Sequence, residues 1–100
     1  MAQLLQLPDP PSAVFAFSDE MALGALAALR ERGLTPGREV SVVGFDGHDL
    51  ADLAGLTTVV QPLLRIGELA AEITCAAIDR RTLDISAHVL PTTLVARSST

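Results

Sequence analysis

Short apolar runs alternate with longer segments of helical periodicity along the chain. The first run, Ala13–Phe17, is continuous and lies between a proline cluster and Ser18. Such a run is typical of a central parallel strand that is covered on both faces. Ser18 then suits the N-cap of a helix over Asp19–Arg32, and Gly33 suits the left-handed position that ends it.

A second run, Val40–Val43, is rich in β-branched residues and predicts a buried strand that ends at Asp46. A polar loop over residues 47–55, with room for a helical turn, follows it. The pattern then predicts a strand, a second long helix and two short extended segments, which we place at Leu56–Gln61, Pro62–Arg81, Ser86–Leu90 and Thr93–Ala96. Because strands alternate with helices, we expect an α/β fold, a three-layer parallel sheet flanked by helices.

The helix over residues 19–32 is apolar on every side of its first three turns, which read M-A-L-G-A-L-A-A-L. A helix on one face of a sheet needs only a single apolar stripe. Met21, Ala25 and Leu29 supply that stripe, whereas Leu23 and Ala27 lie on another side. That side therefore predicts a second covering surface, either a partner subunit or another part of the same fold.

Composition narrows the function classes. The 100 residues are 49% hydrophobic, which fits one globular domain. With a net charge of −5 and no basic cluster, the chain offers no face for phosphates, so we expect no direct DNA binding by it. It has no membrane-length apolar stretch and no signal peptide, so we expect a cytoplasmic protein without membrane contact. The single Cys75 excludes an internal disulfide and a multi-cysteine zinc site.

Candidate ligand contacts gather where the predicted strands end. Asp46 follows a buried strand, and open α/β sheets bind ligands outside the carboxyl ends of their strands. The alternative interpretation is an Asp that forms a turn before glycine. Ser18, Asp19 and Gln61 also follow strands, and helix capping explains them equally well.

Metal binding and catalysis have less support in the sequence. Asp46, His48, Asp49 and Asp52 carry suitable ligand atoms, but their spacing matches no loop with defined ligand positions. The sequence contains no P-loop, no G-x-G-x-x-G turn and no nucleophile elbow. We therefore expect no metal site, no cofactor and no catalytic residue, and hence no enzyme.

Four segments together resemble the carboxyl-terminal subdomain of the lactose/galactose repressor (LacI/GalR) family. They read A-V-F-A-F-S-D-E-M-A-L-G-A-L, V-S-V-V-G-F-D, L-T-T-V-V-Q-P and L-P-T-T-L-V-A-R-S-S-T. The resemblance implies the fold of type I periplasmic sugar-binding proteins, whose two α/β subdomains close on a small ligand. It implies that residues 11–100 form an effector-binding and dimerisation subdomain without the family's DNA-binding headpiece. Residues 1–10 would then be the remnant of a preceding helix and a linker.

The same resemblance implies a set of ligand contacts. Asp46 falls on the family's effector-hydroxyl-binding Asp, and Ser18 falls where the family often has a ligand-contacting Asn or similar side chain. Gln61 and Leu63 fall at positions that approach the effector pocket, and Asp19 stands next to Ser18. An ionised carboxylate makes strong hydrogen bonds to sugar hydroxyls. The implied ligand is therefore a small sugar-like or nucleoside-like effector.

Dimerisation is also implied, because the family uses the apolar helix after S-D and the loop after the Asp as its dimer interface. The corresponding residues for a homodimer are Leu23, Ala27, Leu50 and Leu53. The sequence is compatible with two alternative functions. The chain is part of a LacI/GalR-like transcriptional regulator with half of a sugar-type effector cleft, or it is an autonomous dimerising interaction module that binds no small molecule.

Overall fold

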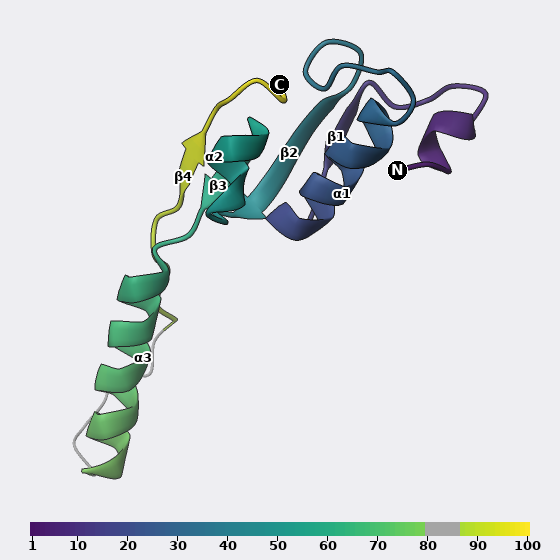
Figure 1. Cartoon of the computed structure of the whole chain (residues 1–100). Helices are drawn as coiled ribbons and strands as arrows, with labels where there is room; N and C mark the ends of the chain where they lie inside the picture. The colour runs from purple at the N-terminus through teal and green to yellow at the C-terminus, as the bar shows by residue number, and fades with distance from the viewer. Residues whose placement is uncertain (80–86) are drawn as a thin grey trace. The chain divides into compact units, whose positions relative to one another are not determined.

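The computed structural model describes residues 1–79 and 87–100 (Figure 1). Two compact units make up the chain. The first comprises Met1–Gln61 together with Thr93–Thr100, and the second comprises Pro62–Thr92. The division between a linker over residues 1–10 and a subdomain over 11–100 stays a prediction.

A four-stranded sheet in the order β1-β2-β3-β4 forms the centre of the first unit. Its strands are β1 (Ala13–Phe15), β2 (Ser41–Asp46), β3 (Thr57–Val60) and β4 (Thr93–Val95). β1, β2 and β3 run parallel, whereas β4 pairs with β3 in the antiparallel direction. The register places Phe15 beside Val43 and Asp46 beside Val60. The predicted α/β class is confirmed, and β4 makes the sheet mixed.

Helix α1 (Asp19–Arg30) covers one face of this sheet and packs over β2. The Ser18 hydroxyl caps it by accepting the backbone N–H of Met21 at 3.2 Å, as its position in the sequence predicts. The helix ends two residues before the predicted Arg32. Gly33 follows in a turn with φ of 71°, a conformation that favours glycine.

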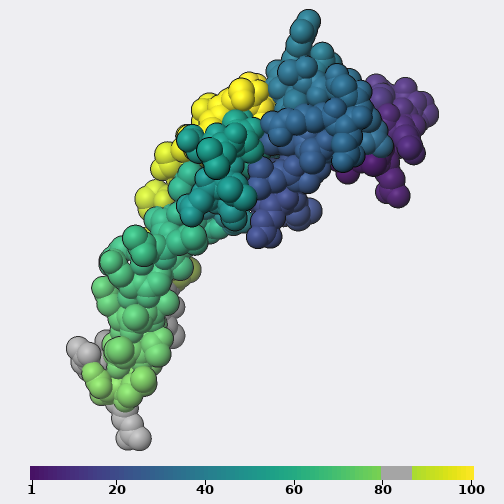
Figure 2. Space-filling model, in the orientation of Figure 1, coloured from purple at the N-terminus to yellow at the C-terminus, as the bar shows by residue number. Residues whose placement is uncertain are grey.

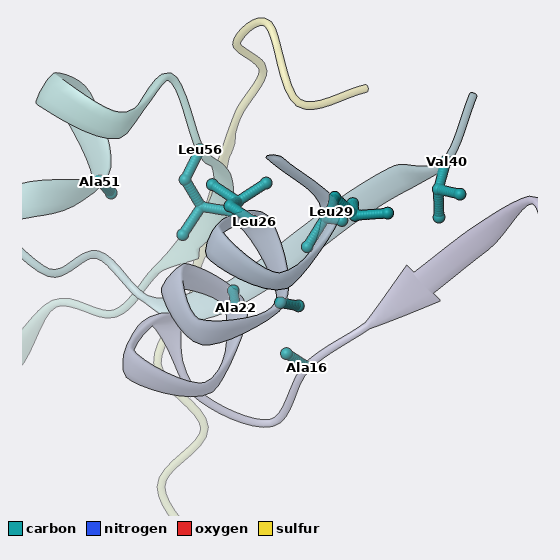
Figure 3. Packing of buried hydrophobic residues seen from close by; sticks show 9 residues of the cluster. Ala16, Ala22, Leu26, Leu29, Val40, Ala51 and Leu56 are labelled. Carbon is teal, nitrogen blue, oxygen red and sulfur yellow. The ribbon is translucent and has the colours of Figure 1, made fainter. Parts of the chain in front are cut away.

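The short helix α2 (Leu50–Ala54) fills the loop after β2, where the sequence left room for a helical turn, and it lies beside α1. Gly55 ends it in the left-handed conformation. Figure 3 shows the apolar core between these helices and the sheet. Its buried members are Ala16, Ala22, Ala25, Leu26, Leu29, Val40, Val42, Ala51 and Leu56.

The opposite face of the sheet carries aromatic side chains that are at least half exposed within the first unit. Phe15 is 54% exposed and Phe17 is 81% exposed. The Phe15 ring makes edge-to-face contacts with Phe17 and Phe45, at centroid distances of 6.0 and 6.5 Å. β1 lies at the edge of the sheet, so the prediction of a central strand is wrong for it, while the cover on its second face stays a prediction. A continuous apolar run shows that both faces are apolar, but it does not show what covers the second one.

The C-terminal residues form hydrogen bonds with the first residues of both β2 and β3. The Ser99 hydroxyl donates to the Val42 carbonyl at 2.6 Å and accepts the Thr57 N–H at 2.8 Å. The Val42 N–H donates to the Ser99 carbonyl at 2.7 Å. Arg97 adds a bond from its guanidinium to the Leu56 carbonyl at 2.7 Å. These contacts join residues about forty to sixty positions apart, and no local sequence pattern predicts them.

The second unit contains α3 (Leu63–Ile78), which follows Pro62 as predicted. The predicted end at Arg81 and the first residue of the segment Ser86–Leu90 lie outside the described residues, and residues 87–90 form no strand. None of the α3 side chains is buried. The predicted core face therefore stays a prediction; it comprised Ile66, Leu69, Ala70, Ile73, Ala77 and Ile78. In the part of the chain that the structure describes, every helix is too short or too polar to cross a bilayer.

Leu26 is fully buried at the centre of the core. We expect Leu26→Ala to lower the free energy of unfolding by about 2–5 kcal/mol, because it removes buried methyl groups and leaves a cavity. Leu64→Ala, at a largely exposed position of α3, should change it by less than about 0.5 kcal/mol. Urea unfolding followed by circular dichroism measures both values. Equal losses in the two variants would contradict the position of the core.

Candidate functional site

The carboxyl ends of β2 and β3 bring Asp46 and Gln61 together. The Gln61 side-chain amide donates to Asp46 Oδ1 at 2.8 Å, and the Gln61 backbone N–H donates to the Asp46 carbonyl at 3.3 Å. Both residues are half-buried. The predicted neighbourhood of their two strands is confirmed by the parallel register. A carboxylate and an amide thus stand side by side where open α/β sheets bind their ligands.

The backbone of Asp46 adopts an unusual conformation. Its φ of 123° is the only positive value for a residue other than glycine among the described residues. Such conformations cost about 1–3 kcal/mol and are concentrated at functional sites. The next residue, Gly47, has φ of 82°, and a Cβ there would lie 2.7 Å from a Val60 methyl carbon. The turn after Asp46 therefore requires glycine at position 47.

Asp19 lies beneath this turn and is fully buried. Its Oδ2 accepts the backbone N–H groups of Gly47 at 2.9 Å and His48 at 2.7 Å, while its Oδ1 accepts the hydroxyl of Thr58 at 2.5 Å. Both oxygens thus face groups of the chain itself. Asp19 was predicted as a ligand contact, but in this structure it supports the turn from below and has no exposed surface for a ligand.

Gly44 in β2 makes room for this carboxylate. A Cβ at position 44 would lie 2.1 Å from Asp19 Oδ1 and within 3.2 Å of Leu56 and Ala22 side-chain atoms. Neither Gly44 nor Thr58 stands out as a functional residue in the sequence. Their roles depend on the pairing of Thr58 with Gly44 on the neighbouring strand, which no local sequence pattern predicts.

Ser18 and Leu63 are the other two predicted ligand contacts. Ser18 is half-buried at the start of α1, directly before Asp19, and its Oγ accepts the Met21 N–H. Capping occupies one acceptor position of the hydroxyl and leaves its proton available for donation. Leu63 is 61% exposed in the first turn of α3 and belongs to the second unit. Both assignments as ligand contacts remain predictions.

The candidate metal ligands have other roles. His48 Nδ1 accepts the Leu50 N–H at 3.0 Å, and Asp52 accepts the Arg97 guanidinium at 3.1 Å. Among residues 1–79 and 87–100, His, Cys, Asp and Glu side chains form no group of three that is suited to a metal ion.

The predicted dimer residues lie on the two helices of the first unit. Leu23 is half-buried and packs against the core, whereas Ala27 is exposed. Leu50 is half exposed, and Leu53 is 85% exposed. The surfaces of α1 and α2 adjoin on one side of the unit (Figure 2). A partner on this side would meet Ala27, Leu50 and Leu53 directly.

Comparison with known proteins gives consistent matches over the whole chain. A family model described as a periplasmic binding protein-like domain matches residues 1–100. The HTH-type transcriptional repressor CytR of Escherichia coli K12 is 38% identical over 102 residues, covering 100% of this chain and 30% of the relative. The chain thus spans about a third of the length of that curated relative.

Solved structures of regulators share the fold. The transcriptional regulator LacI from Bacillus cereus subsp. cytotoxis NVH 391-98 superposes with a TM-score of 0.92 at 28% identity, covering 98% of this chain and 36% of its own. A Lac repressor dimer bound to operator and the anti-inducer ONPF gives a TM-score of 0.88 at 30% identity, covering 99% of this chain and 35% of its own.

The chain folds into a mixed sheet with a carboxylate and an amide at its carboxyl edge, and one family model matches it over its full length. Together these observations define a periplasmic binding protein-like domain. The chain belongs to this family, and the relatives named above are LacI-family transcriptional regulators, as the sequence resemblance predicted. CytR is named as a transcriptional repressor and not as an enzyme.

Gly44→Ala tests the contact between β2 and Asp19. We expect it to lower the free energy of unfolding by about 1–3 kcal/mol, because the added methyl group overpacks a site closed by a bonded carboxylate. Gly67→Ala adds the same group at a helical position with nothing within 4 Å, where it should be neutral or stabilising by up to about 1 kcal/mol. Thermal unfolding of both variants measures the difference. A neutral Gly44→Ala would show that Asp19 is not held against the strand.

Proposed function

We propose that the first unit forms one wall of the effector-binding cleft of a LacI-type transcriptional regulator, acting in the cytoplasm on a sugar-like or nucleoside-like effector. The observation that carries this proposal is Asp46, a carboxylate held in a strained backbone conformation at the carboxyl edge of the sheet and bonded to Gln61. The match to the family over the whole chain supports it.

The chemistry of the three proposed contacts suits a ligand that carries hydroxyl groups. The Gln61 side-chain amide donates to Asp46 Oδ1, and no described residue donates a hydrogen bond to Oδ2. Oδ2 can therefore accept a ligand hydroxyl, and a charged acceptor forms the stronger hydrogen bond. The Gln61 side-chain oxygen is a second acceptor, and the Ser18 hydroxyl is a donor. A site built in this way rejects analogues that lack the matching hydroxyl.

The α1–α2 surface is the proposed site of homodimer assembly. We propose that Leu23, Ala27, Leu50 and Leu53 contribute to a two-fold homodimer, with Leu23 acting from below through its packing on the core. The Lac repressor was solved as a dimer on its operator, which supports this arrangement. We assign operator contact to parts of the protein other than residues 1–100, since the sequence of these residues has a net charge of −5.

Asp46→Asn tests effector binding, because it keeps the shape of the side chain and removes its charge. We expect the wild-type chain to give saturable heat in calorimetry with at least one member of a panel of D-ribose, D-galactose, cytidine and adenosine. Asp46→Asn should weaken that binding roughly 10- to 100-fold, the usual worth of a hydrogen bond to a charged group. Asp49→Asn, an exposed acid in the same loop, is the matched control. Absence of heat across the panel would favour the dimerising module that binds no small molecule.

Leu53→Asp tests the homodimer without touching the core, since Leu53 is 85% exposed. We expect the wild-type chain to sediment as a dimer and the variant as a monomer with an unchanged midpoint of thermal unfolding, because a charge buried in an apolar interface without a partner is costly. Leu64→Asp, at a similarly exposed leucine of α3, should leave the dimer intact. A dimer that persists in Leu53→Asp would exclude this surface.

A further inference from the structure

We infer that Asp19 is a positioning residue for Asp46: its buried carboxylate fixes the turn after β2 and thereby aims the Asp46 side chain. The inference rests on the proposed function, since it gives Asp46 its role as ligand contact. It extends that function by assigning the discrimination between ligands to a residue that no ligand touches.

The chain on both sides of Asp46 is held in place around its strained conformation. A residue with φ of 123° keeps this geometry only where its surroundings fix the chain on both sides. On the amino-terminal side, β2 is paired with β1 and β3. On the carboxyl-terminal side, the next two backbone N–H groups, those of Gly47 and His48, both donate to Asp19 Oδ2. Asp19 therefore supplies the restraint immediately after Asp46.

Asp19 is itself held by the elements around it. It occupies the first position of α1, where the helix dipole favours a negative charge. Its other oxygen accepts the Thr58 hydroxyl from β3, and Gly44 leaves the space in which the carboxylate lies. The described residues offer it no Lys, Arg or His partner, so backbone amides and one hydroxyl satisfy it. A carboxylate fixed from α1, β2 and β3 is a rigid support for the turn.

A positioning residue differs from an ordinary structural residue in the properties that its loss affects. A residue that only stabilises the fold affects every property in proportion to the folded fraction. A residue that acts through Asp46 affects the amides of the turn and the preference for ligand hydroxyls, and it has no further effect once Asp46 is removed. These two signatures differ in hydrogen exchange and in a double-mutant cycle.

Hydrogen exchange of the wild-type chain is the first test and needs no variant. We expect the amides of Gly47 and His48 to exchange at least about tenfold more slowly than the amide of Asp49 in the same loop. In Asp19→Ala their protection should fall by about tenfold or more relative to Leu26 in the core of α1, since each loses a hydrogen bond to a charged group. Glu20→Ala removes the neighbouring exposed acid and should leave both amides protected.

Two results of the exchange experiment would overturn the inference. The first is rapid exchange of Gly47 and His48 in the wild-type chain, which decides the matter even if Asp19→Ala does not fold. The second is a uniform loss of protection at Gly47, His48 and Leu26 in Asp19→Ala, which is the mark of global destabilisation.

Ligand discrimination is the second test, with the panel of D-ribose, D-galactose, cytidine and adenosine and the deoxy analogue of each. For the member that binds, we expect the wild-type preference over its deoxy analogue to be about tenfold or more and to collapse to about twofold or less in Asp19→Ala. Adding Asp19→Ala to Asp46→Ala, which removes the side chain that Asp19 positions, should then change neither affinity further. A preference retained in Asp19→Ala, with weaker binding of both ligands, would overturn the inference. If no member binds, the proposed function fails while the exchange experiment still decides the role of Asp19.

Discussion

The buried carboxylate of Asp19 is the constraint on which the carboxyl edge of the sheet depends. An ionised group inside a protein is costly unless hydrogen bonds replace its lost water. In this chain the replacement comes from two backbone amides of one turn and from the Thr58 hydroxyl of a neighbouring strand. Gly44 clears the volume of the carboxylate, and Gly47 gives the turn its positive φ beside Val60. The two glycines of G-F-D-G thus each have a structural reason at this edge of the sheet.

Much of this site could be predicted from the chain alone. A β-branched run that ends in Asp46, a second run that ends in Gln61 and the rule for open sheets together place both side chains at one edge. The structure confirms that these strands are neighbours and shows the two side chains bonded. The capping role of Ser18 was equally accessible, since it depends only on the first turn of α1. These features are local, or they follow from strand order.

The role of Asp19 could not be predicted in the same way. From the sequence, an Asp after Ser18 suits both the first turn of a helix and a ligand contact, and both interpretations use only neighbouring residues. Its actual partners lie 28 to 39 positions away on other elements. The same limit explains the bonds of Ser99 to β2 and β3, which span 42 and 57 positions. It also explains the aromatic face around Phe15, because an apolar pattern does not identify what covers it.

The proposed effector site and the proposed dimer surface share their supports. Helix α1 begins at Asp19 and carries Leu23 and Ala27 over its next two turns, while the turn after Asp46 leads into α2 with Leu50 and Leu53. A ligand bound at Asp46, as proposed, would contact the turn whose amides bond to Asp19 at the start of α1. Coupling between two sites requires a ligand that distinguishes two arrangements of a shared element. The junction of the β2 turn with α1 is the element that the two proposed sites share, because Asp19 bonds to both Gly47 and His48 and no other described side chain does.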